Sequence, residues 1–312
     1  MDMSAATRHY LGASAPWLAD GGLETDIIFH HGIDLPAFAS FVLLDTVEGR
    51  DALTLYFDRY LALAQGAGTG FVLDTATWRA NAPWIRRMGL TDDDVARVNA
   101  DAVRFAKGVA RRWGDVPHVL NGVIGPAGDG YTVGQGMTPQ AARDAHMPQV
   151  AALAAAGVDL VTAMTMTHVE EAAGIVAAAE EAGLPVAVSF TVETDGNLPS
   201  GQPLAQAIAA LDDRAPVPPL YYMVNCAHPD HFAHILDGAD WADRIGGIRA
   251  NASRQSHAEL DAATELDEGD ADEFGQLYAR LARDLPGLRV IGGCCGTDHR
   301  HVGAAAAWLT VA

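Results

Sequence analysis

The feature that most constrains this chain is an eightfold alternation of short apolar segments with longer segments rich in Ala and Leu. Short apolar or β-branched runs indicate buried strands, and the longer segments between them indicate helices. We expect strands at Trp17–Gly21, Gly70–Thr75, His118–Ile124, Asp159–Met164, Pro185–Thr191, Leu220–Asn225, Arg244–Arg249 and Leu288–Gly292. We expect helices at Arg50–Ala67, Asp92–Trp113, Pro139–Ala156, Val169–Ala182, Pro203–Leu211, His231–Ala239, Asp270–Asp284 and His301–Thr310. The pattern predicts an α/β fold, a (β/α)8 TIM barrel.

The length and the element boundaries are consistent with this fold. A chain of 312 residues is normal for one (β/α)8 barrel, so we expect a single domain over residues 1–312. Gly157 and Gly183 stand where helices should stop before strands, and Thr138 followed by Pro139 starts a helix well. The acidic stretch Asp261–Glu273 is interpreted as a solvated loop after the seventh strand.

Charge and cysteine usage exclude several classes of protein. The formal net charge is −20, so nucleic acid and anionic membranes would be repelled as partners. No apolar run reaches the ~18 residues that a membrane span needs, and the start lacks the pattern of a signal peptide. Three cysteines, two of them adjacent, suit a reducing compartment. We therefore expect a cytoplasmic protein, whose oligomeric state the sequence leaves open.

All three cysteines follow predicted strands, at the end of the barrel where active sites lie. Cys226 follows the sixth strand, and Cys294 and Cys295 follow the eighth. Zinc favours thiolate ligands in tetrahedral geometry, and three protein ligands leave a fourth position open for catalysis. Flanking glycines allow the sharp turn that adjacent cysteines need. Taken singly, Cys226 is more typical of a small buried hydrophobe, and the adjacent pair also fits a redox disulfide. Their shared location favours a metal site.

Other motifs are weak. None of the twelve histidines forms an HExxH pair, and the chain has no Walker loop, no GxGxxG after the first strand and no GxSxG elbow. The sequence therefore offers little support for phosphate, dinucleotide or serine-hydrolase chemistry.

Three motifs together resemble the homocysteine S-methyltransferase family. They are DGGLET at Asp20–Thr25, the NC step at Asn225–Cys226 and GGCCGT at Gly292–Thr297, and the resemblance runs from about Trp17 to Leu309. It implies a (β/α)8 barrel in which Cys226, Cys294 and Cys295 bind Zn²⁺. It also implies a catalytic role for Asp20, with Gly21, Gly22 and Asn225 in the substrate site.

The resemblance further implies a zinc-dependent S-methyltransferase of methionine biosynthesis. Its partners would be a small-molecule thiol acceptor and a methylated cationic donor of the S-methylmethionine, S-adenosylmethionine or betaine type. The methyl group would pass to the zinc-bound thiolate of homocysteine and give methionine. Two alternatives stay open, namely the same chemistry on another thiol or selenol and a non-catalytic zinc-binding barrel.

Several residues depart from the family pattern. Met164 stands where members usually carry a glutamate for the amino group of homocysteine, and a thioether cannot pair with an ammonium. The step from Thr75 to Trp78 ends in tryptophan where many members have tyrosine. Glu24 is a carboxylate where members more often have a small or apolar residue, and we interpret it as a catalytic-site replacement for the missing glutamate. The substrate site thus includes Thr75, Trp78 and Met164 beside Asp20 and Glu24.

Overall fold

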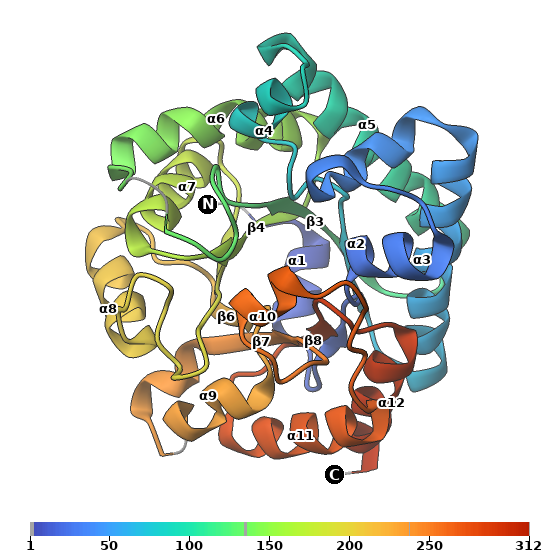
Figure 1. Cartoon of the computed structure of the whole chain (residues 1–312), viewed down its shortest axis with the longest axis vertical. Helices are drawn as coiled ribbons and strands as arrows, with labels where there is room; N and C mark the ends of the chain where they lie inside the picture. Colours follow the sequence, from blue (N-terminus) through green and yellow to red (C-terminus); the bar gives the residue numbers. More distant parts are fainter. Residues whose placement is uncertain (1–2, 134–135, 237, 312) are drawn as a thin grey trace.

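The computed structural model of the protein describes residues 3–133, 136–236 and 238–311. Eight parallel strands close into a barrel in sequence order (Figure 1). They are β1 (Trp17–Leu18), β2 (Phe71–Asp74), β3 (His118–Ile124), β4 (Leu160–Met166), β5 (Val186–Phe190), β6 (Tyr222–Asn225), β7 (Ile245–Ala250) and β8 (Val290–Gly293). The predicted (β/α)8 fold is confirmed, and every strand lies within three residues of its expected ends.

Helices surround the barrel (Figure 1). The eight predicted from the sequence are α3 (Val47–Ala67), α5 (Asp92–Arg112), α6 (Pro139–Ala156), α7 (Val169–Glu181), α8 (Leu204–Arg214), α9 (Pro229–Leu236), α11 (Ala271–Asp284) and α12 (His299–Val311). Local chemistry explains where they begin. The Thr138 hydroxyl accepts from the Ala141 amide at the start of α6, where Pro139 needs no amide partner. In the part of the chain described, no helix combines the length and apolarity needed to cross a membrane.

One short helix closes the amino-terminal end of the barrel. Helix α1 (Ala5–Leu11) buries Tyr10 against Trp17 and Tyr221, which stand at or just before the starts of β1 and β6. The Tyr10 and Tyr221 hydroxyls lie 2.8 Å apart. This end is therefore packed shut, and the opposite end remains for a site.

Short segments that the sequence did not predict surround that opposite end. They are α2 (Leu23–Thr25), the π-helix Asp26–His30, the 3-10 segment Ser40–Asp45, α4 (Ala82–Arg87) and α10 (His257–Ala262). The stretch interpreted as a solvated loop needs correction at both ends, because Asp261 lies in α10 and Ala271 begins α11. The loop between them is largely exposed, but several of its residues line the cavity described below.

The segment Ser40–Asp45 packs directly on the first turn of α3. A Cβ at Gly49 would lie 2.3 Å from the Leu43 carbonyl oxygen, whereas one at Gly66, near the other end of the same helix, would meet nothing within 4 Å. We predict that Gly49→Ala lowers the free energy of unfolding by about 1–3 kcal/mol through overpacking. Gly66→Ala should raise it by about 0.5–1 kcal/mol, since alanine favours the helix. Urea unfolding of both variants measures this, and equal effects would contradict the packing account.

Candidate metal and substrate site

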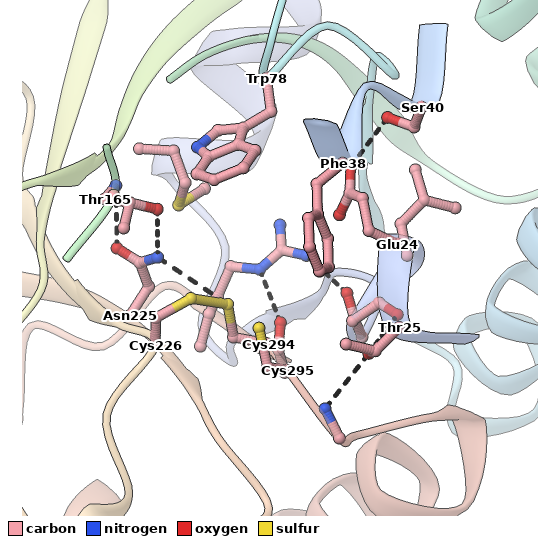
Figure 2. Close-up of a pocket in the computed structure, with 18 of the residues that line it drawn as sticks. Glu24, Thr25, Phe38, Ser40, Trp78, Thr165, Asn225, Cys226, Cys294 and Cys295 are labelled. Carbon is pink, nitrogen blue, oxygen red and sulfur yellow. Dashed lines mark hydrogen bonds between the residues drawn. A yellow bond between two sulfur atoms is a disulfide. The ribbon is translucent and has the colours of Figure 1, made fainter. Parts of the chain in front are cut away.

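A cavity of about 340 Å³ opens at the carboxyl ends of the strands. Its lining includes every residue that the sequence singled out, namely Asp20, Gly21, Gly22, Glu24, Thr75, Trp78, Met164, Asn225, Cys226, Cys294 and Cys295. Figure 2 shows the three cysteines at one side, Trp78 at another, and Glu24 with Phe38 at a third. The fold thus brings together residues that are up to 275 positions apart in the chain.

The three cysteine sulfurs form one cluster, all within 4.8 Å of one another. Cys226 and Cys294 are joined by a disulfide, and Cys295 is a free thiol whose sulfur lies 3.4 Å from the Tyr131 hydroxyl. A disulfide between the adjacent cysteines, the redox alternative drawn from the sequence, is not the pairing present. Tetrahedral zinc with Zn–S bonds of about 2.3 Å holds its sulfurs roughly 3.8 Å apart. The cluster therefore offers the donor type that zinc prefers, and reduction of the disulfide would leave three thiols close enough together to bind one ion.

Asn225 and two glycines hold the cysteine segments together. The Asn225 side chain accepts from the Ser189 hydroxyl at 2.6 Å and donates to the Thr165 hydroxyl at 2.8 Å, and its amide lies 3.9 Å from the Cys294 sulfur. A Cβ at Gly22 would come within 2.4 Å of the Cys294 carbonyl oxygen, and Gly296 has φ +77°. The backbone can therefore turn and approach closely at both positions.

Two aromatic side chains, His257 and Tyr131, support Cys226. This residue adopts φ +54°, in the left-handed region. Its carbonyl oxygen lies 2.7 Å from His257 Nε2, which must be the donor because a carbonyl only accepts. The His257 ring stacks on Tyr131 with centroids 4.2 Å apart, so α10 and the loop after β3 meet above the thiols. His257 had no sequence signal, because α10 is too short for a helical pattern to be seen.

A buried charge cluster forms the base of the site. The Arg249 guanidinium on β7 contacts the carboxylates of both Asp20 and Asp74 and donates to the Gly293 carbonyl at 3.1 Å. The Tyr56 hydroxyl donates to Asp20 at 3.2 Å. Burial raises the pKa of Asp20 to about 7, although Arg249 opposes the shift. The position of Arg249 at the end of the seventh predicted strand was the signal that could have identified it.

Glu24 and Met164 lie apart on the cavity wall. Glu24, on α2, accepts a hydrogen bond from the Ser40 hydroxyl at 2.8 Å, and burial raises its pKa. Met164 on β4 is 7% exposed and places no charge in the cavity. Met164 therefore offers no carboxylate at the position where the family pattern has one, and Glu24 is a carboxylate of the same cavity lining on another element.

The fold and site define a (β/α)8 barrel with a thiol cluster at the carboxyl ends of its strands, and comparisons with known proteins identify the family. The family model for homocysteine S-methyltransferase matches residues 17–309. The chain belongs to the homocysteine S-methyltransferase family.

Two relatives give the range of similarity. The homocysteine S-methyltransferase YbgG of Bacillus subtilis (strain 168) is 27% identical over 172 residues, which span 52% of this chain and 50% of that protein. The homocysteine methyltransferase MmuM from Escherichia coli superposes with a TM-score of 0.74 in its oxidized form and 0.73 in its metallated form, at 22% and 21% identity. Each match covers 97% of this chain and 99% of the other. At this identity, the MmuM likeness establishes the fold alone.

Removing the central cation should destabilise the protein strongly. We predict that Arg249→Met lowers the free energy of unfolding by about 3–5 kcal/mol at pH 7, because the buried carboxyl groups of Asp20 and Asp74 then lose the cation that pairs with both. The matched control is Arg254→Met, which removes an exposed arginine from its ion pairs with Asp230 and Glu273 and should change stability little. Urea unfolding measures both, and equal losses would contradict this account.

The loss in Arg249→Met should also depend on pH. Native Asp20 keeps its proton up to about pH 7, whereas an unfolded aspartic acid loses its proton near pH 3.8. The stability that Asp20 contributes through this difference is therefore full below about pH 4 and is lost as the pH rises to 7. Without Arg249 the native pKa rises further. The stability gap between variant and wild type should therefore widen as the pH rises above about 7, and a constant gap across that range would show that Asp20 is not involved.

Proposed function

We propose that this chain is a zinc-dependent S-methyltransferase that moves a methyl group from a sulfonium or ammonium donor to the thiol of homocysteine, giving methionine. The observation that carries the proposal is the convergence of three cysteine sulfurs to within 4.8 Å in the main cavity of a chain of this family. The family match and the name of YbgG support homocysteine as the acceptor.

Cys226, Cys294 and Cys295 would hold the zinc after reduction of the disulfide. Zinc, when bound, supplies the Lewis acidity that favours deprotonation of a ligating thiol at neutral pH. The protein residues around the cysteines then set the geometry. Asn225 orients Cys294 through its 3.9 Å contact, and Tyr131 covers Cys295. Arg249 holds the ends of β7 and β8 together through the Gly293 carbonyl.

The cavity wall suits the charge change in methyl transfer. A new C–S bond forms to the acceptor sulfur while the bond from the methyl carbon to the donor sulfur or nitrogen breaks, and its electron pair leaves with the donor. An anionic thiolate and a cationic donor become two neutral groups, so exclusion of water from the reacting atoms favours the transfer. Trp78 and Phe38 line this cavity, and aromatic faces attract methylated cations. We assign them to donor binding.

Glu24 is the candidate partner for the ammonium of homocysteine. Met164 offers no charge, whereas Glu24 is a cavity carboxylate for which no ion pair is present in the described part of the chain. We predict that Glu24→Gln raises the KM for homocysteine roughly 10- to 100-fold, as loss of a charged hydrogen bond requires. Met164→Leu, the matched control, should leave the KM nearly unchanged. Steady-state kinetics with a fixed donor measures both, and an unchanged KM in Glu24→Gln would remove Glu24 from the acceptor site.

The second candidate function is the same methyl transfer to a different thiol or a selenol. Met164 favours it, because this residue replaces the carboxylate that the family uses for the homocysteine amino group. Here Glu24 would serve another part of the acceptor, or none. This candidate predicts stoichiometric zinc without methionine formation from any donor.

Turnover of the reduced, zinc-loaded protein tests the proposal. Homocysteine should be converted to methionine with one or more of S-methylmethionine, S-adenosylmethionine, dimethylsulfoniopropionate and betaine, detected by mass spectrometry. Cys295→Ala should lose the activity and most of the zinc, because three ligands become two. Absence of methionine with every donor, in a protein that holds one zinc per chain, would contradict homocysteine as the acceptor.

A further inference from the structure

A second arginine lies in the cavity wall, in surroundings unlike those of Arg249. Arg79 follows Trp78 after β2, lines the cavity and is only 6% exposed. Its guanidinium carbon lies 3.9 Å from the centroid of the Trp78 ring and 3.8 Å from that of Trp84, so the group is sandwiched between two indoles. Nη1 donates to the Gly128 carbonyl at 2.8 Å. The buried Nε has no hydrogen-bond partner in the structure.

Arg79 is a buried cation without a carboxylate in contact. Within residues 3–133, 136–236 and 238–311, no acidic oxygen comes within the 4.0 Å of an ion pair with Arg79, whereas Arg249 has two such partners. Burial lowers the pKa of Arg79 to about 10, so it remains charged at neutral pH. A buried charge with an unsatisfied donor is costly, so its presence in a cavity wall calls for an explanation.

The other charges of the cavity explain why an anionic ligand would need this residue. The acidic residues that line the cavity are Asp20, Glu24, Asp74, Asp129, Asp261, Glu265 and Asp267. The two carboxylates at Arg249 already satisfy that cation. Of the two cations that line the cavity, Arg79 is the one for which no ion pair with a protein carboxylate is present in the described part of the chain, so a ligand carboxylate can pair with it. The guanidinium fork suits a carboxylate, and stacking between two rings leaves its edge as the face for hydrogen bonds.

We propose that Arg79 is a specificity-determining residue that binds the carboxylate of an α-amino acid substrate, while Glu24 binds the ammonium of the same molecule. Both groups line one cavity. Burial lowers the pKa of Arg79, and the charges of Asp129 and then Glu24 oppose that shift, so Glu24 lies within electrostatic reach of Arg79. The inference rests on the proposed function for the choice of amino acid, which is either homocysteine or a sulfonium donor derived from methionine. The recognised chemistry, an ammonium and a carboxylate on one carbon, is the same in both.

Equilibrium binding, which needs no turnover, tests this directly. Isothermal titration of the reduced full-length protein would compare L-methionine with 3-(methylthio)propylamine, which differs only by lacking the carboxylate. The wild type should bind methionine more tightly than the amine. Arg79→Gln should weaken the binding of methionine roughly 10- to 100-fold and leave the affinity for the amine unchanged. The control is Arg87→Gln. Arg87 also stacks on Trp84, at 4.5 Å, and donates to a backbone carbonyl at 2.8 Å, but it does not line this cavity. The Arg87→Gln variant should bind both ligands as tightly as the wild type does.

Three results would overturn the inference. The first is equal affinity of the wild type for the two ligands. The second is that Arg79→Gln weakens the binding of both ligands by the same factor. The third is that Arg87→Gln weakens methionine binding as much as Arg79→Gln does. If Arg79→Gln does not fold, Arg79→Lys keeps a cation between the indoles and should lose a smaller part of the preference for methionine over the amine, because it lacks the fork. An unchanged preference in that variant would also count against the inference.

Kinetics with carboxylate-free substrates separates the two sources of the amino acid. If Arg79 binds the acceptor carboxylate, the kinetic parameters of the wild type with 3-aminopropanethiol in place of homocysteine should resemble those of Arg79→Gln. If Arg79 binds the donor carboxylate, the same should hold with the decarboxylated sulfonium in place of S-methylmethionine. Carboxylate binding that depends on Arg79 without any methionine formation would refute the proposed function and leave the inference standing. Turnover with an unchanged KM for both substrates in Arg79→Gln would refute the inference and leave the proposed function standing.

Discussion

The arrangement of the site depends on one buried cation. Arg249 reaches from β7 to Asp20 after β1, to Asp74 at the end of β2 and to the Gly293 carbonyl on β8. These contacts tie together the strand ends that carry or adjoin the cysteine pair, and the Arg249 carbonyl accepts from the Cys226 amide at 3.1 Å. The position of the thiols therefore follows from a charge cluster beneath them, which a low-dielectric interior makes strong and also costly to break.

The two cavity arginines illustrate how surroundings decide what a buried charge does. Arg249 is matched by carboxylates of the protein, and the cluster they form supports the barrel end. Arg79 is held by aromatic faces and one carbonyl, with a donor left over, so its charge is available to a ligand. In a chain with a net charge of −20, such a position stands out, because the 40 Asp and Glu residues outnumber the 20 Lys and Arg residues.

The sequence predicted the barrel and the convergence of the cysteines for physical reasons. Buried parallel strands give apolar runs, and parallel closure brings the residues after every strand to one end. The same reasoning placed Asp20, Trp78 and Asn225 in the cavity lining. It could not find His257, which stands on a six-residue helix, or the pairing of Arg249 with Asp20 and Asp74, which depends on side-chain direction. The sandwich of Arg79 between Trp78 and Trp84 was hidden as well, because α4 is too short to show a pattern.

The central claim is that the three thiols bind zinc and leave one position for the acceptor sulfur. X-ray absorption at the zinc edge of the reduced, zinc-loaded protein tests this most directly, before and after addition of homocysteine. The account predicts three sulfur neighbours at about 2.3 Å and a fourth when homocysteine is added. A shell of nitrogen and oxygen neighbours, or one that homocysteine leaves unchanged, would contradict it.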